Sequence, residues 1–231
     1  MTTYQVNLEF NPSEKFKVYL SDVMFEFSHM DNVAYHLQYL EYLYQVQRDI
    51  PLILTLKSLR IKTIIVELVG IIESLLYDAV WRLTWDRTRG KSPIKRGEGF
   101  AAIIKMALEE CIIPQDLKKD IFDLSILRNR IHLSLIKDSE KDWHYYDESK
   151  LAFAERCCEK TVTHFLYNRR RKLRDIPDPT TFPYPWKTYA SIAATTEAVL
   201  GSSRVGRDGV RSNKVRRSAS WPKKSSDDFC G

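Results

Sequence analysis

The chain has 231 residues, of which 44% are hydrophobic and 12% aromatic. This composition supports a packed core in one large or two small domains and excludes a wholly disordered chain. The net charge is +6, but residues 201–231 hold eight Lys and Arg against three Asp, or +5, which leaves +1 for residues 1–200. The basic charge therefore belongs to the tail and says little about what the folded part binds.

The cysteines and the apolar stretches indicate the cellular compartment. The four cysteines, at positions 111, 157, 158 and 230, form no ordered framework, and adjacent Cys157 and Cys158 are poor disulfide partners for each other. A reducing compartment fits this usage, and we expect a cytoplasmic protein. The N-terminus lacks a signal-peptide pattern, and charged residues interrupt the most apolar stretch, 61–83. That stretch predicts a core helix rather than a membrane span.

The N-terminal region combines strand-like and helical patterns. Apolar residues alternate with polar ones over residues 4–10, which predicts a short extended arm. A first helix is predicted from Pro12 to about Ser28 and a second from Asp31. The second helix carries tyrosines that could stack on bases, but we favour a core role for an aromatic stripe at this spacing. These tyrosines are Tyr35, Tyr39, Tyr42 and Tyr44.

The middle of the chain holds two long helical patterns, Pro51–Trp85 and Pro114–Ile136. We expect them to be the two central antiparallel helices of an all-α helical bundle. A short helix is predicted at Phe100–Glu110, after a basic loop that we expect to be solvated rather than bound to phosphate. A last helix begins at Glu148 and ends in the basic run 169–174, where positive charge suits a helix C-terminus.

The helix predicted at Pro114–Ile136 has two apolar bands. The first follows the helical spacing of about 100° per residue and comprises Leu117, Ile121, Leu124, Ile131 and Leu135. The second lies on the far side and comprises Phe122, Ile126 and Leu133. One band suffices for packing within the domain, so two bands predict a core face and a second interface. At this interface we expect a homodimer.

Arg128 is the best functional clue in the sequence, because it lies in the middle of the first band. A buried guanidinium needs a carboxylate, a water-filled cleft or an anionic ligand. Arg128 and His132 are i and i+4, and together they offer a phosphate-binding fork and a group that titrates near neutral pH. The alternative is a structural arginine held by Glu67 or Glu73, and the spacing alone favours it because structural ion pairs outnumber active sites.

The same residues carry a family resemblance. The sequence there reads Leu127-Arg128-Asn129-Arg130-Ile131-His132. It resembles the signature of the HEPN superfamily (higher eukaryotes and prokaryotes nucleotide-binding domain), in which an Arg and a small polar residue precede a His by four to six residues. Residues 71–76 look like the long helix before the motif helix of such domains. The likeness covers about residues 50–170.

The resemblance implies the domain organisation and a first functional hypothesis. Residues 1–175 would form a HEPN-like helical domain, 176–200 a Pro-rich extension with a short helix, and 201–231 a disordered basic tail. The protein would be a metal-independent endoribonuclease of toxin or phage-defence type. Arg128, Asn129 and His132 would be its catalytic residues, RNA its substrate, and an antitoxin-like protein its restraining partner.

A second hypothesis is a non-catalytic dimerisation or binding module that keeps the fold. Only three residues separate Arg128 from His132, one fewer than the usual pattern, and this spacing favours a jointly bound anion over divided catalytic roles. No zinc-ligand spacing, Gly-rich phosphate loop or serine nucleophile elbow is present. We therefore expect no metal and no cofactor under either hypothesis.

Overall fold

The computed structural model describes residues 12–21, 23–50, 52–88, 99–130, 145–168 and 178–188, together with residues 91 and 94. These residues form helices and turns and contain no strand, which confirms the all-α class for the part described. The elements in chain order are α1 (Ser13–Leu20), α2 (Phe27–Asp49), α3 (Leu54–Thr88), α4 (Phe100–Glu109), α5 (Gln115–Asn129), α7 (Glu148–Asn168) and the 3-10 turn η2 (Pro179–Thr181).

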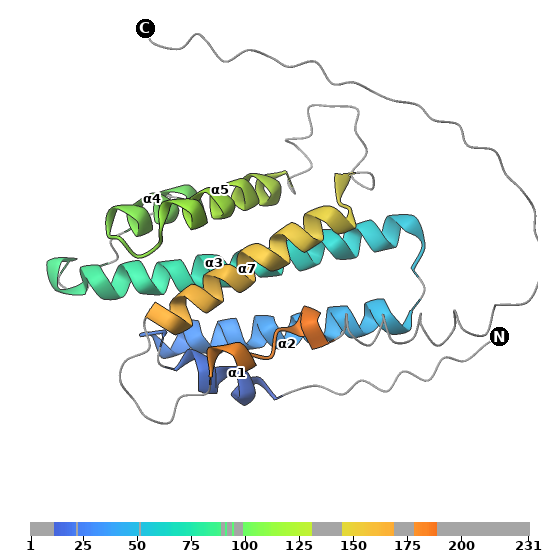
Figure 1. Ribbon diagram of the computed structural model, residues 1–231, viewed down its shortest axis with the longest axis horizontal. Coiled ribbons are helices and arrows are strands. Elements are labelled where there is room, and N and C mark those ends of the chain that lie inside the picture. Colours follow the sequence, from blue (N-terminus) through green and yellow to red (C-terminus); the bar gives the residue numbers. More distant parts are fainter. Residues whose placement is uncertain are drawn as a thin grey trace, which may run out of the picture.

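Helix α3 is the centre of the fold. Its 35 residues make it about 52 Å long at 1.5 Å per residue. Helices α2 and α7 pack on it most extensively, and α4 and α5 also contact it. Figure 1 shows α2 on one side of α3, α4 and α5 on the other, and α7 crossing it. Both α2 and α5 run opposite to α3 in this view. Because α3 has neighbours on several sides, most of its apolar residues are buried.

The first two helices differ from the predicted boundaries. Helix α1 ends at Leu20 rather than near Ser28, and α2 begins at Phe27 rather than at Asp31. The helical spacing of apolar residues misled the prediction, because Val23 and Met24 are buried although they lie in the connecting turn. A buried apolar residue contacts the core, but it need not lie in a helix.

The later helices lie close to their predicted positions. Helix α4 ends at Glu109, one residue before the predicted end, and α7 begins at Glu148 as predicted. Helix α3 begins at Leu54 rather than at Pro51 and extends three residues past Trp85. These small shifts are typical of helix ends, where the sequence signal is weakest.

The tyrosines of α2 do not all belong to the core. Only Tyr44 is buried, whereas the other three predicted core tyrosines are exposed: Tyr35, Tyr39 and Tyr42. The rings of Tyr39 and Tyr42 lie 6.1 Å apart and nearly parallel. The core interpretation is therefore wrong for three of the four.

The Pro-rich segment packs against the helices. Phe182, Tyr184 and Trp186 are buried in the common core. The Tyr19 hydroxyl donates a hydrogen bond of 3.0 Å to the Thr181 carbonyl oxygen, which ties the segment to α1. Residues 178–188 thus complete the core of the helical body. The predicted N-terminal arm, the short helix within 191–200 and the tail 201–231 lie outside the described residues.

Two expectations about the whole chain concern membranes and thiols. Within the described ranges, no helix is both long and apolar enough to cross a membrane. Cys111, Cys157 and Cys158 are free thiols. Burial raises the pKa of Cys157 to about 12, so this thiol is protonated and unreactive at neutral pH.

Candidate functional site at the end of helix α5

Helix α5 is fixed to the body by its first apolar band. Pro114 directly precedes the helix, and Cys111 turns the chain after α4 with a positive φ of 52°. The described residues of the band, Leu117, Ile121 and Leu124, are buried, and so is Leu127, which the prediction does not include in the band. They pack α5 between α3, α4 and α7, and so hold the last turn of α5 against the flank of α3.

Arg128 lies in this last turn and faces Glu73 of α3. Its Nη2 is 3.7 Å from Oε2 of Glu73, and 37% of its side chain is exposed. This distance is beyond the range of a hydrogen bond, so the contact is a loose ion pair. No described residue accepts a hydrogen bond from the guanidinium, which leaves N–H donors for a ligand. Glu67, the other predicted partner, instead pairs with His36.

The two other predicted site residues have different outcomes. Asn129 is the last residue of α5 and is exposed beside Arg128. Arg130 already has turn geometry. His132 lies outside the described residues, as do Leu133 and the rest of the predicted helix to Ile136. The structure thus places Arg128 next to Asn129, and the role of His132 stays a prediction.

Three more cations gather around a pair of tyrosines at this end of α5. The Arg130 guanidinium carbon is 4.1 Å from the ring centre of Tyr145, and Lys150 Nζ is 4.5 Å from it. Lys62 Nζ of α3 lies 5.5 Å from the ring centre of Tyr146. Such contacts stabilise a cation on an aromatic face. We call these five residues the cation–tyrosine cluster.

Hydrogen bonds fix the cluster in place. The Ser58 hydroxyl donates to the Tyr146 carbonyl oxygen at 3.0 Å, and Tyr146 is itself buried. Asp147 accepts the backbone N–H of Lys150 at 3.0 Å and so caps the first turn of α7. Burial alone would raise the pKa of Asp147, but hydrogen bonds from Ser149 and Lys150 outweigh it and lower the pKa to about 2.

Charged side chains gather at this end of the body. Four cations lie there, namely Lys62, Arg128, Arg130 and Lys150. Among the described residues, Glu73 contacts Arg128 and Asp147 contacts Lys150. The N–H donors of Arg128 that no described residue uses suit an anion such as phosphate. Sequence reasoning missed the cluster because its contacts join α3, α5 and α7, and the only local signal is two adjacent tyrosines before a helix.

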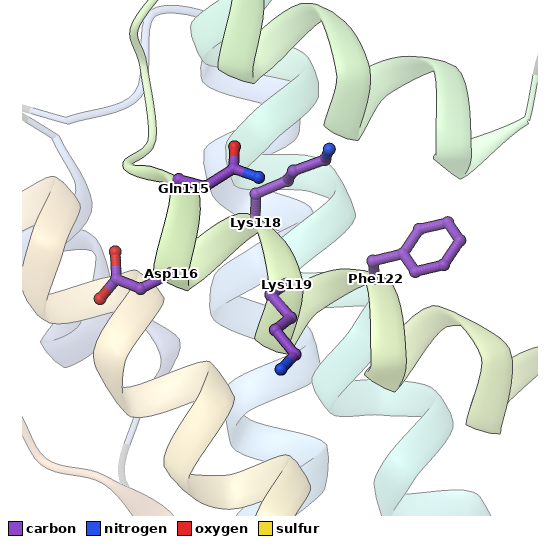
Figure 2. A pocket seen from close by; sticks show the side chains of 5 residues that line it. All are labelled: Gln115, Asp116, Lys118, Lys119 and Phe122. Carbon is purple, nitrogen blue, oxygen red and sulfur yellow. The ribbon is translucent and has the colours of Figure 1, made fainter. Parts of the chain in front are cut away.

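The outer face of α5 carries the second apolar band. Phe122 is 44% exposed and Ile126 49% exposed, so neither is covered by the described residues. A surface pocket of about 600 Å³ lies on the N-terminal half of this face (Figure 2). Its lining residues are Gln115, Asp116, Lys118, Lys119 and Phe122.

A second polar cluster lies between α2, α3 and α7, away from the end of α5. The Tyr44 hydroxyl donates a hydrogen bond to Glu155, and burial raises the pKa of both groups. Nearby, Arg60 is buried and its Nε has no hydrogen-bond partner among the described residues. Burial lowers the pKa of this guanidinium. We assign this cluster to helix packing, because Tyr44 and Arg60 are buried where α2, α3 and α7 meet.

The described residues at the end of α5 have the charge and the donors to bind an anion. Nowhere in the described ranges do three His, Cys, Asp or Glu side chains gather as a metal would require. Comparisons of the chain with protein-family models, with curated proteins and with solved structures find no match.

Proposed function

We propose that the chain is a HEPN-like, metal-independent endoribonuclease whose site is the end of α5. The observation that carries the proposal is the loose pairing of Arg128, which is about one-third exposed and has N–H donors that no described residue uses. The further cations of the cation–tyrosine cluster support it, because they add positive charge where a phosphate would lie.

The chemistry needs little beyond these residues. RNA carries its own nucleophile, the ribose 2′-hydroxyl. The 2′-oxygen would attack phosphorus and lose its proton to a base while the 5′-oxygen leaves and gains a proton. Arg128 would stabilise the negative charge that develops on the phosphate, His132 would transfer a proton, and Asn129 would orient the phosphate.

In-line attack requires a base on one side of the phosphate and an acid on the other, and the predicted motif supplies a single histidine. A two-fold homodimer would bring two such clusters together. We place the dimer contact at Ile126, an exposed residue of the second apolar band. As a toxin or phage-defence nuclease, the protein would act in the cytoplasm under the restraint of an antitoxin-like partner.

A non-catalytic binding module is the second candidate, and the contact between Arg128 and Glu73 favours it. In that case the ion pair would join α5 to α3, and the exposed band would only bind a second copy or another protein. The two candidates differ in whether RNA is cut.

Cleavage of single-stranded RNA by the full chain, with a metal chelator present, tests the proposal. We expect products that end in a 2′,3′-cyclic phosphate and no cleavage of DNA. His132→Ala should lower the rate by about 100-fold or more. Arg156→Ala, at an exposed arginine of α7, is the matched control and should cut normally. Intact RNA at micromolar wild-type protein would support the binding module instead.

The dimer contact has a separate test. Ile126→Asp should give a soluble monomer in light scattering, because an unpaired charge would have to be desolvated in the contact. Val18→Asp changes an equally exposed residue of α1 and should stay dimeric. A wild-type protein that is already monomeric would contradict the contact.

A further inference from the structure

Lys118 and Lys119 differ from the lysines around them. Neither contacts a carboxylate among the described residues. Other helical lysines form ion pairs, as in Lys17 with Asp31, Lys57 with Glu148, Lys105 with Glu109 and Lys160 with Asp120. Two neighbouring ammonium groups are thus left unneutralised on one stretch of α5.

The same stretch offers an aromatic ring in a pocket. Phe122 and the two lysines line the surface pocket of about 600 Å³, a volume within the usual range for small-molecule sites. Figure 2 shows the Phe122 ring extending away from α5, and Asp116 projecting to the opposite side. The lining of the pocket therefore combines two lysines and one exposed ring with a single carboxylate, that of Asp116.

This face leads to the site of the proposed function. Lys118, Phe122 and Asn129 follow i, i+4 and i+11 spacing, which aligns them along one side of the helix. Lys118 and Arg128 are ten residues apart, or about 15 Å along the axis. Ile126 follows Phe122 by four residues, so the proposed dimer contact borders the pocket on its C-terminal side.

We propose that the pocket binds one nucleotide of single-stranded RNA upstream or downstream of the nucleotide held at Arg128. The base would stack on Phe122, and Lys118 and Lys119 would contact the adjoining phosphates. This inference rests on the proposed function. At the 3.4 Å spacing of stacked nucleotides, about four nucleotides would separate the two positions. Stacking on a ring and phosphate contacts by lysine are sequence-tolerant, so binding at the pocket should not depend on base identity.

Binding of labelled single-stranded RNA to the full-length His132→Ala protein tests this inference without interference from cleavage. For a 12-nucleotide RNA, replacing both Lys118 and Lys119 by Ala should weaken binding about tenfold. It should also reduce the slope of log K against log salt by about 1.4, which corresponds to two phosphate contacts. Phe122→Leu should weaken binding about tenfold and Phe122→Tyr should restore it, because only a ring can stack.

Two controls define the outcome. Lys105→Ala, at an exposed lysine of α4, should bind like the parent. A 3-nucleotide RNA cannot span both positions. The parent should therefore bind it more than tenfold more weakly than the 12-nucleotide RNA. The affinity of the 3-nucleotide RNA should differ little between the parent and the double lysine variant. If the lysine and phenylalanine variants bind the long RNA as tightly as the parent, the pocket does not hold RNA.

The same measurements separate this inference from the proposed function. If wild-type protein cuts RNA and the pocket variants bind normally, only the pocket inference fails. If the variants weaken binding but no protein cuts RNA, the pocket stands as an RNA-binding face and the nuclease fails. If the parent binds no RNA, both fail.

Discussion

Helix α3 presents two acidic residues, Asp78 and Glu73, to very different surroundings. Asp78 is fully buried, and its carboxylate accepts the backbone N–H groups of Phe25 at 2.7 Å and Glu26 at 2.8 Å. His29 lies 3.5 Å away. These contacts fix the chain just before α2, and each carboxylate oxygen has a donor.

Glu73 meets Arg128 at 3.7 Å with both side chains about one-third exposed. No described residue uses the remaining donors of the guanidinium, whereas Asp78 has its acceptors engaged by short bonds. Buried polar groups of structural importance are normally satisfied by protein partners. The comparison therefore favours a stabilising role for Asp78 and supports the proposal that the end of α5 binds a ligand.

The largest effect is expected at Asp78. Asp78→Ala should lower the free energy of unfolding by about 3 kcal/mol, because two N–H groups lose a charged acceptor. Denaturant unfolding followed by circular dichroism measures this change. Asp120→Ala is the control, since Asp120 forms only a surface ion pair with Lys160 and should cost less than about 1 kcal/mol. If both variants lower the free energy of unfolding equally, Asp78 is no more important for stability than a surface ion pair.

A smaller effect is expected at Glu73. Glu73→Gln should cost less than about 1 kcal/mol of stability, because the pair with Arg128 is partly exposed and long. RNA binding should become severalfold tighter, since a negative charge beside the phosphate position is removed. Fluorescence anisotropy at fixed salt measures the affinity. Loss of about 3 kcal/mol of stability with unchanged RNA affinity would make the pair structural, like Asp78.

The smallest effect concerns the pair of His36 with Glu67. The hydrogen bond to Glu67 raises the pKa of His36, although burial opposes it. A raised pKa means that the folded state favours the protonated ring, so the added stability is present below about pH 6.5 and is lost as pH rises through the folded value. We expect His36→Gln to cost a few tenths of a kcal/mol at pH 6 and nothing at pH 9. A cost that grows as the pH rises would contradict a raised pKa of His36.

Periodicity predicted the helices well because apolar spacing directly records burial. It gave the start of α7 at Glu148 and the buried face of α5 at Leu117, Ile121 and Leu124. It also offered Glu73 as one of two partners for Arg128, because an arginine within an apolar band needs an acid nearby.

Sequence reasoning could not predict features that depend on contacts between distant elements. The exposure of Tyr35 depends on how α2 is rotated against α3, and the spacing of the tyrosines does not fix that rotation. Asp78 acts on residues more than fifty positions away, and Trp186 is buried only because its segment returns to the helices. The cation–tyrosine cluster likewise forms only when α3, α5 and α7 meet.

The claim that the end of α5 is a ligand site is tested most directly by two measurements on one protein, Arg128→Ala. We predict that its free energy of unfolding falls by less than about 1 kcal/mol, because the Arg128 side chain is about one-third exposed and loosely paired. We predict that its RNA cleavage in chelator falls by about 100-fold or more. A loss of about 3 kcal/mol of stability, with no cleavage by the wild-type protein to lose, would contradict the account.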